Sequence, residues 1–128
     1  RIYTPNKLAD LPIMLYIHGA GFIAGDLDSH DNVCRFLSDH LQCLVVAVDY
    51  RLSPEYTFPI PIDDCYKAFL WVHEHREELI HTTRPIIIAG DSAGANLALA
   101  LYLKNHEAKG PKVASMILIN PLVDKILF

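Results

Sequence analysis

The sequence predicts an α/β fold with a mostly parallel sheet and helices on both faces. Short apolar runs recur at residues 13–17, 43–48, 86–89 and 115–119, and they are rich in Ile, Val and Leu without polar alternation. Such runs are typical of strands buried on both faces. Segments with helical spacing lie between them, and this strict rotation of strand and helix favours right-handed crossovers and a parallel sheet.

The first helix is predicted between the runs at 13–17 and 43–48. Its apolar residues fall at i, i+3, i+4 and i+8, namely Val33, Phe36, Leu37 and Leu41. Ser29 is placed to cap this helix, and Asp31 lies in its first turn, where a carboxylate is favoured. We therefore expect the face that carries these four residues to pack on the sheet.

The second and third helices follow the same logic. In the second, the periodic apolar residues are Cys65, Ala68, Phe69 and Val72. Asp63 and Asp64 precede them, and the charged run at 73–78 is expected to fray the helix end. The proline-rich segment at 54–61 is expected to be an extended connection, because each proline fixes its own φ. The third helix, at 93–106, is dense in Ala and Leu and should be deeply packed.

Composition excludes several classes of protein. The chain has 128 residues, 52% of them apolar, which suits one globular domain or a piece of one. Eleven basic against fifteen acidic residues give a net charge of −4, so neither a nucleic-acid partner nor an anionic membrane surface is indicated. The longest apolar runs, 43–48 and 97–103, fall far short of the roughly 20 residues that a membrane span needs. The sequence says nothing of the oligomeric state.

Cysteine and histidine patterns predict no metal, no cofactor and no disulfide framework. Cys34, Cys43 and Cys65 are odd in number and lack C-x-x-C spacing. A reducing compartment, and hence a cytoplasmic location, is the expectation that follows. His73 and His75 are two apart, which on a helix points their rings to different faces.

The strongest chemical signal is GDSAG at 90–94, which matches the G-x-S-x-G nucleophile elbow. The motif lies between a β-branched run and an Ala/Leu-rich helix, the strand-turn-helix context that such a turn requires. Glycines two residues to either side of Ser92 are expected because the turn is too tight for bulkier neighbours. Ser92 is then strained, with its hydroxyl held out at the N-terminus of the third helix. The alternative is that Ser92 is merely a helix cap.

A second signal is HGAGF at 18–22, directly after the strand at 13–17. A loop of small residues there leaves backbone N–H groups facing the carboxyl end of the sheet, where ligands bind in open α/β folds. Gly19 and Ala20 could each offer an N–H to an oxyanion, and Ala93, the residue after the nucleophile, could supply a third. A plain packing turn is the alternative for this motif.

These motifs resemble the hormone-sensitive-lipase-like branch of the α/β-hydrolase esterases. HGAGF, DYRLSPE at 49–55, FPIPIDD at 58–64 and GDSAGAN at 90–96 follow the order and approximate spacing of that branch. The resemblance covers nearly the whole chain. It implies that residues 1–128 are the central part of an α/β-hydrolase domain whose cap and C-terminal strands are missing, with RIYTP at the start as the tail of an earlier strand.

The resemblance implies a carboxylic-ester hydrolase that forms an acyl-enzyme on Ser92, with short-chain or aryl esters as substrates. Gly19, Ala20 and Ala93 would form the oxyanion hole, and His18 would organise the loop. By the same likeness the DYRLSPE residues are structural, with Arg51 and Glu55 as candidates for an internal ion pair. The glycine trio of the family is here Gly-Ala-Gly, so the hole survives if Ala20 needs no positive φ.

The sequence offers no evident general base for Ser92. In α/β hydrolases the acid and then the histidine follow the serine, yet the sole histidine after Ser92 is His106, fourteen positions along the same predicted helix. That spacing puts it about 21 Å away. Asp124 comes too early to match the family's acid, and Asp91 is interpreted as structural because its side chain should point away from the serine. We therefore expect an interior piece of a longer protein, nearly inactive by itself.

Other functions stay open at this point. His18 could act as the base only in a chain order unlike that of the family. A non-catalytic small-molecule binder can use the same fold, as the plant gibberellin receptors do, and fold alone does not fix function. A peptidase or an acyl transferase with the same elbow is a third, weaker option.

Overall fold

A computed structural model describes residues 1–6 and 10–124 of the chain. The strands are β1 (Ile2–Tyr3), β2 (Ile13–Ile17), β3 (Leu44–Val48), β4 (Ile86–Asp91) and β5 (Val113–Ile119). The helices are α1 (Asp31–Leu41), α2 (Ile60–Ile80) and α3 (Ala93–Glu107). The predicted strands and helices are therefore all present, with ends that differ by a few residues.

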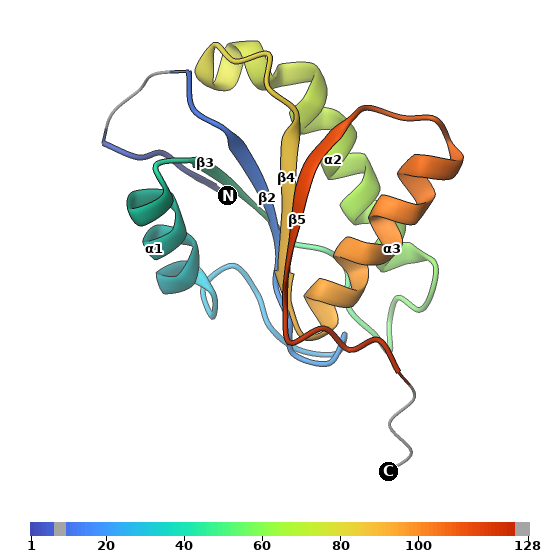
Figure 1. The fold of residues 1–128 in the computed structure, drawn as a ribbon. Coiled ribbons are helices and arrows are strands. Elements are labelled where there is room, and N and C mark those ends of the chain that lie inside the picture. The colour runs from blue at the N-terminus through green and yellow to red at the C-terminus, as the bar shows by residue number, and fades with distance from the viewer. Residues whose placement is uncertain (7–9, 125–128) are drawn as a thin grey trace.

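The strands form one sheet in the order β1-β3-β2-β4-β5 (Figure 1). β3, β2, β4 and β5 are parallel, and β1 alone is antiparallel, paired with β3. Helix α1 lies on one face of the sheet, while α2 and α3 lie on the other (Figure 1). The predicted fold class, a mostly parallel sheet with helices on both faces, is confirmed.

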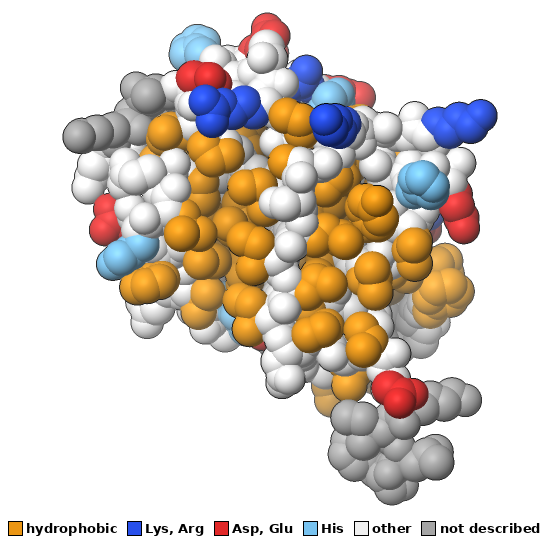
Figure 2. Space-filling model, viewed as in Figure 1, with side chains coloured by type: hydrophobic (Ala, Val, Ile, Leu, Met, Phe, Trp, Pro, Cys, Tyr) orange, Lys and Arg blue, Asp and Glu red, His pale blue; other side chains and the backbone are white. Residues whose placement is uncertain are grey.

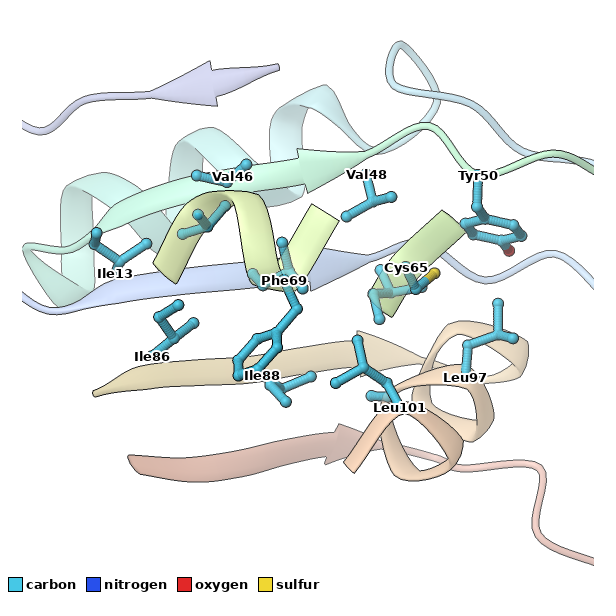
Figure 3. Close-up of a cluster of buried hydrophobic side chains, with 14 of the residues drawn as sticks. Ile13, Val46, Val48, Tyr50, Cys65, Phe69, Ile86, Ile88, Leu97 and Leu101 are labelled. Atoms are coloured by element: carbon cyan, nitrogen blue, oxygen red, sulfur yellow. The ribbon is translucent and has the colours of Figure 1, made fainter. Parts of the chain in front are cut away.

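The larger core lies between the sheet and helices α2 and α3 (Figure 3). Phe69 from α2 and Leu101 from α3 are fully buried there against Ile86 and Ile88 of β4. On the opposite face a smaller core packs Cys34 of α1 against the strands. Because β2 is buried along its whole length by both layers, its carboxyl end, where the HGAGF loop begins, has a rigid support.

The predicted packing face of α1 is wrong at three of its four residues, and of the four Leu37 alone packs against the smaller core. Val33, Phe36 and Leu41 are 39%, 57% and 51% exposed, whereas Cys34 and Ser38 are buried. The Ser38 hydroxyl has two backbone carbonyl acceptors within reach for its one proton, that of Cys43 at 2.9 Å and that of Tyr3 at 3.2 Å. A short polar side chain with nearby acceptors thus takes a core position that hydrophobic spacing alone assigns elsewhere.

The predicted start of α1 is also wrong in detail. The cap position is His30, with no side-chain cap hydrogen bond. Ser29 instead closes the preceding turn, where its N–H donates to Asp26 Oδ1 at 2.7 Å and its hydroxyl accepts from the Asp26 N–H at 3.0 Å. The side chains of Asp26 and Ser29 each accept from the other's backbone N–H, and these local bonds form in place of a cap on α1.

Helix α2 is longer than predicted at both ends. It begins at Ile60, inside the segment expected to be extended, because Pro61 fits the first turn of a helix, where its missing N–H costs nothing. The charged run at 73–78 does not fray, and the helix continues to Ile80. Val72 and Ile80 are buried on either side of that run, so tertiary packing anchors the charged turns between them.

Strand β5 departs from the prediction of burial on both faces. It is the outermost strand of the described sheet, pairs only with β4, and leaves Ile117 and Ile119 exposed. Figure 2, which views the molecule from this side, shows hydrophobic side chains gathered over the face. Within the described residues the apolar composition of β5 therefore does not correspond to burial on both faces. None of the described helices is long and apolar enough to cross a membrane.

Candidate active site

Ser92 stands at the sharp turn between β4 and α3. Its backbone has φ 51° and ψ −116°, a conformation that is costly for any residue with a β-carbon. The Ser92 N–H donates to the Ile119 carbonyl at 2.9 Å, and its carbonyl accepts from Asn96 at 3.1 Å. Ser92 occupies the cap position of α3, but its side chain makes no cap hydrogen bond. A simple helix cap therefore does not account for this serine.

The two glycines of the motif are required by close approach, as predicted. A β-carbon at Gly90 would lie 2.6 Å from the carbonyl oxygen of Gly94. One at Gly94 would lie 2.5 Å from the carbonyl oxygen of His18 and closer still to that of Ile17. These separations are far inside van der Waals contact, so the elbow can form only with glycine at both positions.

The HGAGF loop lies beside the elbow because β2 and β4 are neighbours. Ile17 pairs in register with Gly90, so the residues that follow each strand emerge side by side at the carboxyl edge of the sheet. The Gly19 N–H donates to Asp91 Oδ1 at 3.1 Å, which ties the loop directly to the residue before Ser92. The structure therefore brings the predicted nucleophile and the predicted oxyanion loop together.

The hydrogen bonds of the loop change the list of donors. The Gly19 N–H is committed to Asp91, which removes Gly19 from the oxyanion donors that the sequence predicts. Within the described residues the N–H groups of Ala20 and Gly21 have no backbone or side-chain acceptor, and both residues are exposed. Ala93 is the first residue of α3, where a helix leaves its N–H groups unpaired. Three N–H groups near the elbow thus remain available.

Ala20 adopts a positive φ of 90°. The condition set from the sequence, that Ala20 needs no positive φ, is therefore not met. An alanine in this region is strained by its β-carbon, whereas glycine is not. The loop holds this strained conformation and leaves the Ala20 N–H unpaired, which is the feature that an oxyanion donor needs.

His18 is buried and engaged in holding the loop. Its Nδ1 lies 2.9 Å from the Gly19 carbonyl oxygen, to which it donates, and its ring stacks on Tyr50 with centroids 4.4 Å apart. Tyr50 in turn donates its hydroxyl to the His18 carbonyl at 2.7 Å. Within the described residues Nε2 of His18 has no partner and is not exposed to solvent. These contacts fit a loop-organising role.

Asp91 points away from the serine side of the turn, toward a group of hydrogen-bond donors. Its carboxylate accepts from the Tyr16 hydroxyl at 2.8 Å and from the Gly19 N–H at 3.1 Å, and His30 Nε2 lies 3.3 Å away. The structural interpretation of Asp91 agrees with these contacts. His30 was not singled out from the sequence, since a lone histidine before a helix carries no motif.

The predicted ion pair between Arg51 and Glu55 is wrong. Arg51 instead pairs with Asp64 through Nη2 to Oδ1 at 2.7 Å and Nε to Oδ2 at 2.8 Å, and its backbone N–H also donates to Oδ2. Asp64 lies in the first turns of α2, so the pair ties the segment after β3 to that helix. This donation by Arg51 lowers the pKa of Asp64.

An apolar hollow of about 260 Å³ lies between the end of the HGAGF loop, the start of α2 and α3, and its described lining does not include Ser92. Phe22 of the HGAGF loop, Phe58 just before α2, Ile62 in its first turn and Leu97 of α3 line most of it, and Ser53 and Asn96 are its polar residues. A larger hollow of about 610 Å³ lies between β1 and α1 and includes none of the site residues. Among the described residues no group of three or more His, Cys, Asp or Glu side chains is placed to hold a metal ion.

This fold and elbow define a class of protein. The chain belongs to the alpha/beta hydrolase fold family, whose model matches residues 14–127, and its resemblance to hormone-sensitive-lipase-like esterases is confirmed. Among curated proteins it is 40% identical over 124 residues to Esterase LipI and 40% identical over 122 residues to Carboxylesterase NlhH, both of Mycobacterium tuberculosis. It is also similar in structure to a bacterial heroin esterase, with a TM-score of 0.92 and 41% identity over 97% of this chain.

A further solved structure, the thermostable carboxylesterase EstE1 from a metagenomic library, has a TM-score of 0.90 and 43% identity over 97% of this chain. The match covers less than half of the length of each of these relatives. The chain spans 39% of Esterase LipI, 38% of Carboxylesterase NlhH, 39% of the heroin esterase and 42% of EstE1. Esterase activity therefore comes to this chain only as a proposal.

Proposed function

We propose that this chain is the nucleophile-bearing part of a carboxylic-ester hydrolase. Ser92 attacks the ester carbonyl and carries the acyl group, which water then releases. The observation that carries the proposal is the setting of Ser92, whose backbone is strained and whose side chain makes no cap hydrogen bond. The HGAGF loop lies beside it and is held to the preceding residue, Asp91, by the hydrogen bond from the Gly19 N–H. Relatives named as esterases share this part of the fold at about 40% identity.

The oxyanion of the tetrahedral intermediate is stabilised by backbone N–H groups. We assign Ala20, Gly21 and Ala93 as donors, in place of the predicted set that included Gly19. N–H groups fixed in advance at a developing charge are worth about 3 to 4 kcal/mol each in barrier height. The N-terminus of α3 adds a favourable dipole at the same point.

The general base and the carboxylate that orients it are assigned to residues outside these 128. His18 is stacked and buried, His30 faces Asp91, and His106 lies at the far end of α3 from Ser92. A serine without a base retains only the oxyanion and binding contributions. The chain by itself is therefore nearly inactive.

The proposed substrate class, short-chain or aryl esters, is supported by the apolar hollow at the end of the HGAGF loop. Its volume of about 260 Å³ and its lining by Phe22, Phe58, Ile62 and Leu97 suit the apolar group of a short-chain or aryl ester. Among the described residues no charged side chain lines it, so an ester with a charged acyl group should be a poor substrate.

The test is turnover of p-nitrophenyl acetate, butyrate and octanoate by the protein expressed from its complete gene. Ser92→Ala should lower kcat by about 10³-fold or more, while Ser115→Ala, at an exposed serine of β5, serves as the matched control. Equal turnover by wild type and Ser92→Ala overturns the proposal. An ester that binds without being turned over by the wild type identifies the non-catalytic binder instead.

A further inference from the structure

The carboxylate of Asp91 joins the nucleophile turn to the loop that follows β2. We propose that Asp91, held in place by Tyr16 and His30, is a positioning residue that fixes the Gly19 peptide and with it the unpaired N–H of Ala20. The proposal rests on the proposed function, because a fixed Ala20 N–H matters for catalysis only if an oxyanion forms beside it. Asp91 itself touches no reacting atom in this account.

Three donors from three separate segments converge on this one carboxylate. Tyr16 comes from β2, Gly19 from the following loop and His30 from the position before α1. A carboxylate can only accept, and it has about four acceptor sites, so all three donors are satisfied together. The Tyr16 contact at 2.8 Å and the Gly19 contact at 3.1 Å have ordinary hydrogen-bond lengths, and the His30 contact at 3.3 Å is longer. The loop is thereby held against the elbow through side-chain chemistry as well as through the neighbouring strands.

The Tyr16 hydroxyl is a dependable donor in this group. It lies 2.8 Å from Asp91 Oδ1, and the residue is 1% exposed. Burial and the adjacent Asp91 carboxylate raise the pKa of Tyr16, so the phenol keeps the proton that it donates. The Asp91 carboxylate is therefore held by one fixed donor from strand β2.

His30 supplies the second anchor, from the surface side. Its Nε2 stands between the two carboxylate oxygens of Asp91, 3.3 Å from Oδ1 and 3.4 Å from Oδ2, and its Nδ1 lies 3.0 Å from the Ser29 hydroxyl. Its Nε2 can donate to the Asp91 carboxylate, while the Ser29 hydroxyl beside Nδ1 donates its one proton to the Asp26 carbonyl at 2.9 Å. The Asp26–Ser29 turn described above thus lies against the ring that contacts Asp91.

Close packing explains why residue 19, whose N–H donates to Asp91, is a glycine. A β-carbon at Gly19 would lie 2.7 Å from the Asp91 backbone oxygen and closer still to Oδ2. On the other side of the same loop a β-carbon at Gly25 would lie 2.7 Å from His18 Nδ1 and 2.8 Å from the Gly19 carbonyl oxygen. The Gly19 peptide is therefore enclosed between Asp91 and the His18–Gly25 contact. Glycine at 19 serves this clamp, which explains its presence although its N–H is not free for substrate.

The direct test uses NMR on the protein expressed from its complete gene, labelled with ¹⁵N and ¹³C. A scalar coupling across the hydrogen bond, from Gly19 ¹⁵N to the Asp91 carboxyl ¹³C, should be present in the wild type. The same spectra report whether His30 Nε2 carries a proton, as donation to Asp91 requires. Absence of the coupling in the folded wild type overturns the proposal without the need for any variant.

Variants then separate positioning from folding. Asp91→Ala should speed amide exchange of Gly19 by about tenfold or more, whereas Asp91→Asn keeps an acceptor oxygen and should restore most of the protection. Asp39→Asn is the matched control, because that carboxylate is on the exposed side of α1 and makes no described side-chain contact. Unchanged Gly19 exchange in a folded Asp91→Ala chain overturns the proposal. If Asp91→Ala fails to fold, Tyr16→Phe, which removes one donor to Asp91, should speed amide exchange of Gly19, and unchanged exchange in that variant overturns the proposal.

Kinetics of the complete gene product distinguish this proposal from the proposed function. Asp91→Ala should lower kcat by about tenfold or more with KM changed by less than about threefold, because an oxyanion donor acts mainly in the transition state. Asp91→Asn should recover most of the kcat. Ser92-dependent turnover that is insensitive to Asp91→Ala overturns the positioning role and leaves the proposed function standing. Absence of turnover in the wild type overturns the proposed function, while the Gly19 coupling still decides whether Asp91 holds the loop.

Discussion

Gly94, in the first turn of α3, lies against the backbone carbonyl of Ile17 at the end of β2. A β-carbon at this position would overlap the Ile17 oxygen and approach the His18 oxygen to 2.5 Å. In an ordinary helix a Gly to Ala change stabilises by about 1 kcal/mol. Here the sign reverses, because the neighbours are backbone atoms of a buried strand.

Gly94→Ala should therefore destabilise the chain by at least about 2 kcal/mol. Urea unfolding followed by circular dichroism measures this change. The matched control is Ala100→Gly, on a partly exposed position of the same helix, which should cost about 1 kcal/mol from helix propensity alone. A Gly94→Ala chain as stable as the wild type would contradict the close approach of α3 to β2.

Ala20→Gly should stabilise the chain slightly. Relief of the positive φ of 90° at Ala20 is worth about 1 to 2 kcal/mol, and the added freedom of glycine in the unfolded state offsets about 0.5 to 1 kcal/mol of it. The measurement is the urea midpoint. Ala24→Gly, in the same loop but without a positive φ, should lower the midpoint, and the same response at both positions would argue against strain at Ala20.

Leu101→Ala should destabilise the chain by about 3 kcal/mol, as expected when a fully buried leucine is removed and leaves a cavity. Leu101 is 0% exposed in the core between the sheet and α3, whereas Leu103, two residues on, is 53% exposed. Leu103→Ala should change stability by less than about 0.5 kcal/mol. Equal effects on the urea midpoint would show that α3 packs by another face.

The ion pair between Asp64 and Arg51 should make the free energy of unfolding depend on pH in the acid range. The pKa of Asp64 is lowered, chiefly by donation from Arg51, so the ion pair stabilises the folded state above the unfolded carboxyl pKa of 3.8. That stabilisation is lost as the pH falls below 3.8 through the folded value. Asp64→Asn should lower the urea midpoint at pH 7 and have a much smaller effect at pH 2. Glu55→Gln is the control, because Glu55 is exposed. A pH-independent effect of Asp64→Asn would refute the ion pair.

The sequence was most informative where local pattern and tertiary role agree. The run at 13–17 and the Ala/Leu-rich segment at 93–106 predicted β2 and α3 with little error, since buried parallel strands and deeply packed helices leave uninterrupted apolar stretches. The motif glycines at 90 and 94 predicted the elbow, because only one kind of turn requires them at that spacing.

Failures arose where a contact between distant segments decides the outcome. The choice of Asp64 rather than Glu55 as partner of Arg51 depends on how α2 returns to the sheet. The commitment of the Gly19 N–H to Asp91, 72 residues away, is equally invisible in a linear pattern. Ser38 of α1 occupies a buried position because two backbone carbonyls lie within hydrogen-bond distance of its hydroxyl. The spacing of apolar residues along the sequence does not reveal such acceptors.

The reactivity of Ser92 tests the central claim most directly. The protein expressed from its complete gene should be treated with a fluorophosphonate, digested and mapped by mass spectrometry. The account predicts one phosphonylated residue, Ser92, at one adduct per chain, with loss of the adduct in Ser92→Ala and its retention in Ser115→Ala. An unmodified Ser92 alongside labelling at another residue would contradict the account.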